Sequence, residues 1–227
     1  MGGMASGLAH EIDQPLSACG AYLATARRLA EMRPEARPAN IEEVLDSAVE
    51  QNLRAGEIVR NLRDFTMRGE PNRAYLSLHH LIGDALHIAT TVQGEGSCEI
   101  SLQLDAKSDP IFADKAQIKQ VLVNLIRNAV EAMSVLTERR LTISFSKIDD
   151  GSIRIDVADT GDGFVEALNS DLFEPFMTTK ADGMGIGLAI CCAAIEAHQG
   201  AIWTESNPGG GAVFNFALPL AKQESDV

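Results

Sequence analysis

The sequence predicts an α plus α/β architecture: a helical hairpin over residues 1–70, followed by an α/β sandwich with a mixed sheet over residues 75–220. In the first region, apolar residues recur at three- and four-residue steps, as they do along the buried seam of a helix. In the second region, short alternating strands are interleaved with helical patterns, which is typical of layered α/β domains. A linker that contains glycine and proline separates the two regions. Residues 221–227 are polar, and we expect them to form a disordered tail.

The hairpin comprises two amphipathic helices separated by a turn that contains Pro34 and Pro38, with Asn40 as the expected N-cap of the second helix. The apolar positions of the first helix are Met1, Ala5, Leu8, Ile12, Leu16, Cys19, Leu23, Ala26 and Ala30. Those of the second helix are Ile41, Val44, Ala48, Ala55, Ile58, Leu62 and Phe65. Two helices alone leave part of such long seams exposed, so we expect a homodimer in which two hairpins form a four-helix bundle.

His10 is the most informative residue of the first helix. It lies two residues from both Leu8 and Ile12, so at about 100° per residue it points away from the apolar seam. We therefore expect it to be exposed, with Glu11 beside it. An exposed histidine with a neighbouring carboxylate has the chemistry of a nucleophile, although a lone surface histidine most often has no such role.

The second unit alternates helices and strands along the chain. Helical periodicity predicts helices over residues 78–91, 114–133 and 185–198. Alternation of apolar and polar residues predicts strands over residues 98–104, 141–145, 153–157, 201–205 and 212–218. We expect these helices to cover the apolar face of a mixed sheet.

The composition of the chain limits its environment and its partners. A net charge of −13 over 227 residues argues against direct binding of nucleic acid, which needs clustered Lys and Arg. The apolar runs are too short for a membrane span and no secretion signal is recognisable, so we expect no membrane segment in this chain and a cytoplasmic location. A full-length protein that contains this chain can still be tethered to a membrane. The four cysteines lack the spacing of zinc sites and are expected to be reduced packing residues.

The helix predicted over residues 114–133 carries amide side chains beside its buried stripe. Gln120, Asn124 and Asn128 follow one another at four-residue steps and so share one face. Because asparagine is a mediocre helix former, two of them in a helix interior indicate that their side chains have partners. Amide oxygens suit Mg²⁺, which takes few protein ligands and completes its shell with water and phosphates. A magnesium–nucleotide site is the functional interpretation, and two surface asparagines are the alternative.

Two glycine-rich segments complete the predicted site. Asp159, Gly161 and Gly163 follow directly on a strand, where a carboxylate can accept a hydrogen bond from the exocyclic amine of adenine and glycines let the base approach the backbone. The same residues are also common in ordinary turns. The second segment opens a helix, whose free amides and dipole suit a polyphosphate, and Lys180 before it can reach a phosphate. Its residues are Gly183, Gly185, Gly187 and Leu188.

In this order and spacing, the motifs resemble the H, N, first glycine, F and second glycine boxes of two-component sensor histidine kinases. The matching residues are His10-Glu11 with Pro15, Asn124 to Ala129, Asp159-x-Gly161-x-Gly163, Phe173-x-Pro175-Phe176 and Gly183-x-Gly185-x-Gly187-Leu188. The run His-Glu-Ile-Asp-Gln-Pro-Leu is most similar to the oxygen-sensing FixL-type kinases. The resemblance implies a dimerisation and histidine-phosphotransfer hairpin followed by a Bergerat-type ATP-binding domain.

The family implies an ATP-dependent protein histidine kinase that uses ATP and Mg²⁺. By this resemblance, His10 accepts the phosphoryl group and Glu11 is its general base. Asn128 corresponds to the magnesium ligand, Asn124 to a residue that supports the phosphates, and Asp159 to the residue that binds adenine. The phosphoryl group then passes to an aspartate on a response-regulator receiver domain. The resemblance also implies an upstream sensor domain, which is missing from this chain.

Two further positions bear on the reaction. Gln14 stands where related kinases use a polar side chain for phosphatase chemistry, so dephosphorylation of the regulator is a second predicted activity. Asp13 stands where asparagine is common, and a carboxylate there would repel an incoming phosphate but could also hold a protonated imidazole, with tolerated surface variation as the alternative. This residue keeps open an alternative, a catalytically silent dimeric scaffold that binds nucleotide. A third alternative is an ATPase of the same superfamily, although such proteins lack the His–Glu hairpin.

Overall fold

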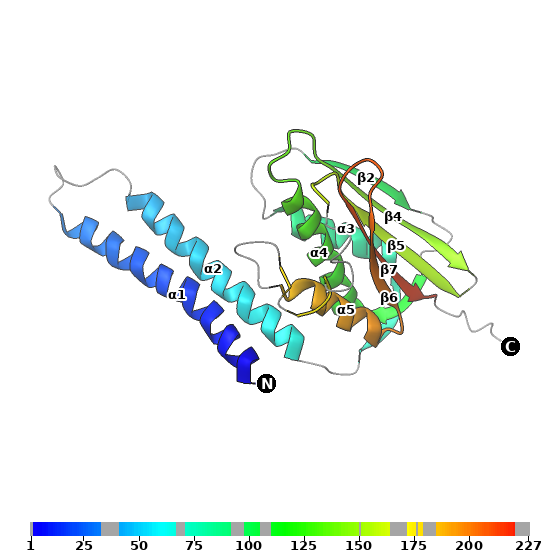
Figure 1. The fold of residues 1–227 in the computed structure, drawn as a ribbon, viewed down its shortest axis with the longest axis horizontal. Helices are drawn as coiled ribbons and strands as arrows, with labels where there is room; N and C mark the ends of the chain where they lie inside the picture. The colour runs from blue at the N-terminus through cyan, green and yellow to red at the C-terminus, as the bar shows by residue number, and fades with distance from the viewer. Residues whose placement is uncertain are drawn as a thin grey trace. The chain divides into compact units, whose positions relative to one another are not determined.

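The computed structural model describes residues 2–32, 41–66, 71–91, 98–104, 110–149, 151–163, 172–175, 177–178 and 185–220. It divides into two compact units, Met1–Arg68 and Gly69–Val227 (Figure 1). Within the described ranges, no helix combines the length and the apolar content that crossing a membrane requires.

The first unit is a helical hairpin formed by α1 (Gly2–Glu31) and α2 (Ile41–Thr66). The two helices pack along their length, and α1 continues through Pro15 (Figure 1). Small side chains suit this close approach, since Ala26 of α1 and Ala48 and Ala55 of α2 are buried. The expected N-cap, Asn40, lies outside the described residues.

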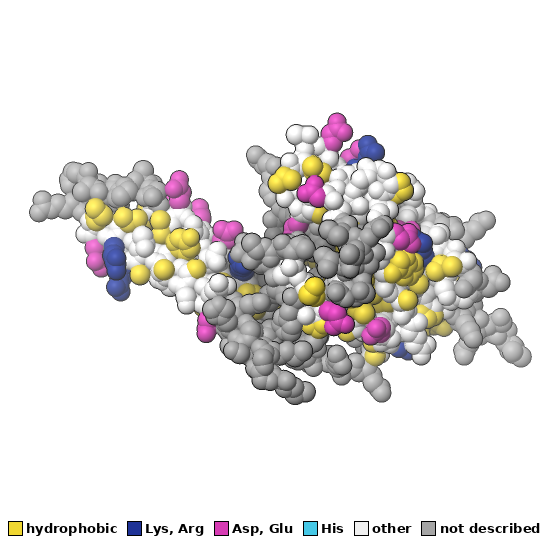
Figure 2. Space-filling model, viewed as in Figure 1, with side chains coloured by type: hydrophobic (Ala, Val, Ile, Leu, Met, Phe, Trp, Pro, Cys, Tyr) yellow, Lys and Arg dark blue, Asp and Glu magenta, His cyan; other side chains and the backbone are white. Residues whose placement is uncertain are grey.

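Each helix of the hairpin also carries apolar side chains that the hairpin itself does not bury (Figure 2). Leu16 and Leu23 belong to the predicted seam of α1, yet they are 48% and 51% exposed. On α2, Leu45, Val49 and Leu53 are exposed as well. The apolar stripe is therefore wider than one helix–helix contact can cover, as the sequence led us to expect.

The described residues of the second unit form two sheets. The strands are β1 (Arg73–Ser77), β2 (Glu99–Leu104), β3 (Pro110–Asp114), β4 (Arg140–Asp149), β5 (Ser152–Ala158), β6 (Ala201–Ser206) and β7 (Ala212–Pro219). Antiparallel β1 and β3 form a small sheet, and the large sheet has the order β2-β4-β5-β7-β6. Because β2 pairs with β4 in parallel and the other pairs are antiparallel, the predicted mixed sheet is confirmed.

The helices described in this unit are α3 (Leu78–Thr91), α4 (Lys115–Ala132) and α5 (Gly187–Ala197). In β5, alternate residues are buried, and Ile153, Ile155 and Val157 join the apolar core together with residues of α3, α4 and α5. The helices therefore cover one face of the large sheet, which is the predicted sandwich (Figure 1).

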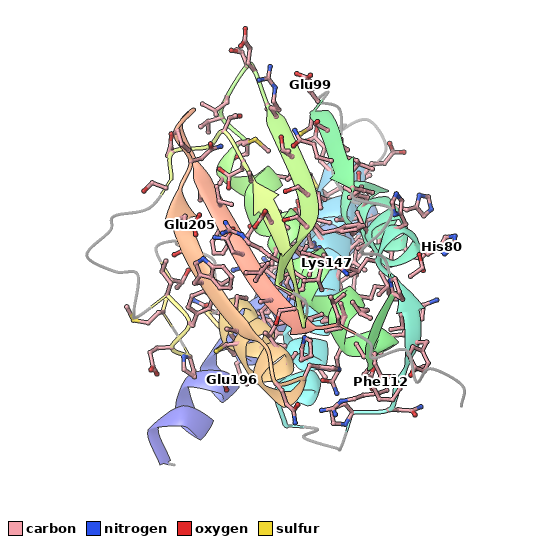
Figure 3. All side chains as sticks on the ribbon, turned by 90° about the vertical axis from the view of Figure 1, so that its right-hand side faces the viewer. His80, Glu99, Phe112, Lys147, Glu196 and Glu205 are labelled. Carbon is pink, nitrogen blue, oxygen red and sulfur yellow. The ribbon has the colours of Figure 1, made fainter. Side chains whose placement is uncertain are left out.

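The opposite face of the large sheet is polar (Figure 3, where Glu205 is labelled). Its centre is Arg154, whose Nη2 donates to Glu205 Oε2 at 2.9 Å and to Asn215 Oδ1 at 2.8 Å. The guanidinium carbon also lies 5.3 Å from the centre of the Trp203 ring. These contacts cross β5, β7 and β6 and so tie three strands together on the face that the helices leave open.

Candidate functional site

Helix α4 positions the first predicted site residues. Asp114 caps its N-terminus, and a continuous apolar stripe holds one face of the helix in the core. On the neighbouring face, Gln120 Nε2 donates to Asn124 Oδ1 at 3.1 Å. Asn124 Nδ2 in turn donates to the carbonyl oxygen of Gly187 at 3.5 Å. Asn124 is therefore a bridge from α4 to the first residue of α5.

The contact between α4 and α5 continues around Cys191. Asn124 Nδ2 lies 3.8 Å from Cys191 Sγ, which itself lies 3.9 Å from the carbonyl oxygen of Val121. Burial raises the pKa of the Cys191 thiol to about 12, so it stays protonated. Asn128, one helical turn after Asn124, is half-buried. The two amides thus lie on the same side of α4, beside the start of α5.

Asp159 follows β5 and is only 1% exposed. Its Oδ1 accepts hydrogen bonds from the backbone N–H groups of Gly161, at 2.8 Å, and Ala212, at 3.2 Å. Burial raises the pKa of this carboxyl group, whereas the two backbone hydrogen bonds act in the opposite direction. Both bonds from described donors end on Oδ1, so Oδ2 is the oxygen left for a donor that a ligand brings.

The chain packs tightly on both sides of Asp159, and this packing explains why glycine stands at positions 161 and 211. A Cβ atom at Gly161 would lie 2.8 Å from the carbonyl oxygen of Ala132, at the end of α4. Gly211, with φ of +92°, has no room either, because a Cβ atom there would lie 2.2 Å from the Asp159 carbonyl oxygen. Asn207 Nδ2 donates to that same oxygen at 2.7 Å.

The turn between β6 and β7 is a part of the site that the sequence did not identify. The sequence signal for it, Gly209-Gly210-Gly211, indicates only a turn. In the structure, Asn207 and the N–H of Ala212 hold Asp159 from one side while Gly211 gives it room.

The second glycine segment is described in part. Gly185 has a φ of +64°, which excludes it from the helix and explains why α5 begins at Gly187 rather than at the predicted residue 185. Leu188 packs against the core. Gly163, in the first segment, also has a positive φ, of +72°. Lys180 and Gly183 lie outside the described residues.

The predicted phosphate acceptor belongs to the other unit. The backbone of His10 and Glu11 is part of α1, but the structure does not describe their side chains. Asp13 and Gln14, which follow them, are exposed on the same helix. His10 and Glu11 thus belong to the first unit, and Asn124, Asn128 and Asp159 to the second.

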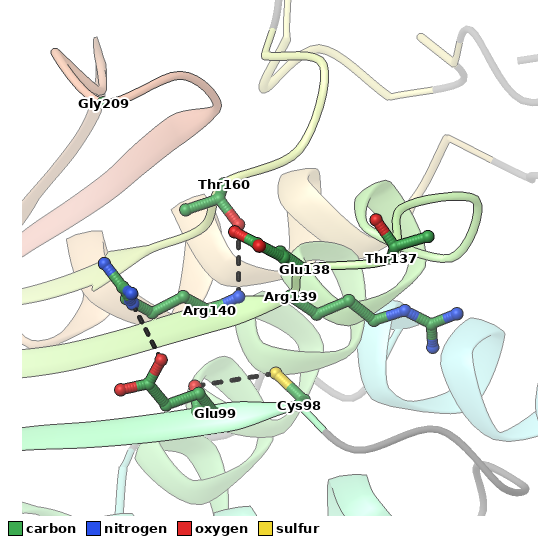
Figure 4. A pocket seen from close by; sticks show the side chains of 8 residues that line it. All are labelled: Cys98, Glu99, Thr137, Glu138, Arg139, Arg140, Thr160 and Gly209. Atoms are coloured by element: carbon green, nitrogen blue, oxygen red, sulfur yellow. Dashed lines mark hydrogen bonds and ion pairs between the residues drawn. The ribbon is translucent and has the colours of Figure 1, made fainter.

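A pocket of about 680 Å³ opens beside Thr160 at one end of the large sheet (Figure 4). Arg140 Nε lies 3.1 Å from Glu99 Oε2, and the Arg140 N–H donates to Thr160 Oγ1 at 3.1 Å. The residues that line this pocket do not include Asn124 or Asp159, so it is not the predicted nucleotide site. Among the described residues, no group of three or more His, Cys, Asp or Glu side chains is arranged to hold a metal ion.

Two known protein families match this chain, one in each of its two units. Residues 1–71 match the His Kinase A phospho-acceptor domain, and residues 113–222 match the family described as histidine kinase-, DNA gyrase B- and HSP90-like ATPases. The sensor protein FixL of Bradyrhizobium diazoefficiens is 45% identical over 98% of this chain. That match covers 44% of FixL, so this chain spans less than half of the relative.

Solved structures agree with the family match. The catalytic domain of the histidine kinase ThkA is 32% identical, with a TM-score of 0.59 over 65% of this chain and 95% of that one. ThkA in complex with the response regulator protein TrrA is 26% identical, with a TM-score of 0.76 over 98% of this chain and 63% of that one. The resemblance inferred from the motifs is thereby confirmed.

Proposed function

Because this chain belongs to the two-component sensor histidine kinases, we propose that it phosphorylates its own His10 from ATP. The observation that carries this proposal is the buried Asp159 carboxyl group, held by two backbone N–H groups directly after β5 in an ATPase-type domain. A buried carboxylate without a cation beside it is costly, so a ligand donor is its natural partner. The exocyclic amine of adenine is such a donor.

In this proposal, the two glycine segments bind the rest of the nucleotide. Gly161 and Gly163 let adenine approach the backbone beside Asp159. Gly187 and Leu188 begin α5 and Gly185 lies just before it, where free N–H groups and the positive end of the helix dipole suit phosphates. We assign Lys180 and Gly183 to the same phosphate-binding segment.

The residues present fit a magnesium ion that arrives with the nucleotide. Asn128 lies one turn after Asn124 on the side of α4 that meets α5, and an amide oxygen is a hard ligand of the kind Mg²⁺ accepts. We assign Asn128 as the protein ligand and Asn124 as a support for the phosphate end of the site. When bound, magnesium offsets charge on the phosphates.

The proposed reaction is in-line phosphoryl transfer. A bond forms between an imidazole nitrogen of His10 and the γ-phosphorus, the bond from that phosphorus to the β–γ bridging oxygen breaks, and ADP leaves. Glu11 takes the imidazole proton as general base. An aspartate of a response-regulator receiver domain then accepts the phosphoryl group from His10. Because ATP is the donor, the reaction belongs in the cytoplasm.

We also propose that the chain acts as a homodimer and meets its regulator on the hairpin. The apolar side chains that α1 and α2 leave exposed favour pairing with a second hairpin into a four-helix bundle. ThkA, of similar fold, has been solved with a response regulator. In the full-length protein, a sensor domain would precede the hairpin.

Incubation of the chain with γ-labelled ATP and magnesium tests the proposal. We expect label that is lost in acid, kept in base and absent from His10→Gln. Nucleotide binding without label would instead indicate a silent scaffold, and sustained phosphate release without a phosphoprotein would indicate an ordinary ATPase. Gln14→Ala tests the phosphatase activity separately, because that role fails if the variant dephosphorylates the regulator at the wild-type rate.

A further inference from the structure

His198 is a buried histidine that the proposed reaction does not use. It follows α5 directly and is 4% exposed. The backbone N–H of Asp114 donates to its Nε2 at 2.9 Å, and its Nδ1 lies 2.7 Å from the carbonyl oxygen of Ala194. Because Nε2 accepts, the ring proton is on Nδ1, which donates to Ala194. Both contacts require this single neutral tautomer.

The contact with Asp114 joins the end of α5 to the start of α4. Asp114 is the N-cap of α4, and its Oδ1 accepts from the backbone N–H groups of Ala116, at 2.9 Å, and Gln117, at 3.2 Å. The residue that donates to His198 therefore also fixes the first turn of the helix that carries both site asparagines.

A second contact holds the same end of α5. Arg73, the first residue of β1, donates from Nη2 to the carbonyl oxygen of Ala197 at 2.6 Å. Arg73 lies opposite Asp114 in the β1–β3 pairing. The end of α5 is thus fixed to the small sheet by one side chain and to α4 by another.

The other end of the helix pair belongs to the candidate site. Asn124 reaches Gly187 at the start of α5, and Cys191 reaches Val121 between the two ends. The helices therefore run antiparallel and are attached at both ends and near the middle. His198 lies 11 residues after Gly187 (198 − 187), which is roughly 16 Å along a helix.

We propose that His198 is a positioning residue for the nucleotide site: by fixing the end of α5 to Asp114, it sets the distance between Asn128 of α4 and the glycine segment that opens α5. This inference rests on the proposed function, because it assigns the site between these helices to a nucleotide. His198 itself touches no nucleotide. Its effect passes through α5, since loss of one attachment at the end of a helix lets that end shift relative to α4 and changes the angle at which the helix begins.

Two substitutions separate this role from simple packing. In His198→Asn, the side-chain amide can still donate to Ala194 but is too short to accept from Asp114. In His198→Gln, the longer side chain can place its oxygen where Nε2 was, so the bond to α4 is kept. Both variants bury one amide in place of one imidazole, so a packing role affects them alike. Arg73→Met loosens the same end of α5 from the other side and leaves His198 in place.

The full chain is compared as wild type and as these three variants, by titration with magnesium–ATP and by amide hydrogen exchange without nucleotide. We expect His198→Asn to raise the Kd about 3- to 10-fold, as for loss of one hydrogen bond. We expect His198→Gln to stay within about twofold and Arg73→Met to lie between them. Exchange at Ile190, whose N–H donates to the carbonyl oxygen of Ile186, and at Cys191 after it should rise in the same order.

Equal Kd and exchange values for the Asn and Gln variants would overturn the positioning role. If His198→Asn does not fold, Arg73→Met alone decides: unchanged exchange at the start of α5 contradicts the proposal. A wild-type chain that binds no nucleotide contradicts the proposed function instead, while the exchange comparison still tests the link between the two ends of α5.

Discussion

Gly211 lies outside the recognised motifs, yet its replacement by alanine should disable the nucleotide site. The new Cβ atom would lie 2.2 Å from the carbonyl oxygen of Asp159 and 2.6 Å from its Oδ1, both far inside van der Waals contact. Because these partners are backbone and a fully buried carboxylate, Asp159 has to move. It then loses its bond from Ala212 and its proposed alignment with adenine.

The size of this effect follows from the bonds involved. A hydrogen bond to a charged group contributes about 1.5–3 kcal/mol, and each 1.4 kcal/mol is about tenfold in affinity. We therefore expect the Kd for magnesium–ATP, measured by calorimetric titration, to rise roughly 10- to 100-fold.

Gly210 supplies a matched control. It has the same φ of +92° as Gly211, but a Cβ atom there would meet nothing within 4 Å. Gly210→Ala and Gly211→Ala thus share the backbone strain, about 1–3 kcal/mol of folding stability, and differ only in the overlap with Asp159. If the two variants bind nucleotide equally well, the packing of Gly211 on Asp159 is not what holds the carboxylate in place.

Three further predictions concern single side chains. Because burial raises the pKa of Asp159, its charged form destabilises the fold, so Asp159→Asn should raise Tm at pH 7 and weaken ATP binding. The gain in Tm should shrink as the pH falls through the raised pKa, and a gain independent of pH would contradict this cause. Cys191, whose pKa is about 12, should resist alkylation at pH 8 until the chain unfolds, which peptide mass spectrometry can follow. Asp13→Asn should speed labelling of His10 about fivefold, as removal of roughly 1 kcal/mol of repulsion implies, whereas an unchanged initial rate would make Asp13 a neutral variation.

The regular elements of the second unit were largely predictable from the sequence. Helix α3 has the predicted bounds, and α4 with its two caps spans the predicted residues 114–133. Both have a long apolar stripe, and Asp114 is a recognisable N-cap. Strands β1 and β3 were not predicted, because each has only five residues. In β3 the alternation of buried and exposed residues rests on Ile111 and Ala113 alone, and β1 has no buried residue. So short a pattern does not distinguish a strand from a loop.

The site was predictable where its residues act through local motifs. Asp159, Gly161 and the two asparagines follow patterns within a few residues of one another. Gly211 and His198 were not identified, because their roles depend on contacts with residues 52 (211 − 159) and 84 (198 − 114) positions away. A glycine run and a lone histidine have ordinary local explanations, and only the folded chain shows what lies against them.

The turn from β6 to β7 also constrains how the chain can vary in length. Hairpin turns on a protein surface usually tolerate inserted residues. Here Asn207 and Gly211 both contact Asp159, one on each side of the turn, and Gly210 N–H also donates to the carbonyl oxygen of Asn207 at 2.9 Å. An insertion between them would separate the two contacts, so relatives that bind the same ligand should keep the number of residues in this turn while varying the exposed Pro208 and Gly209.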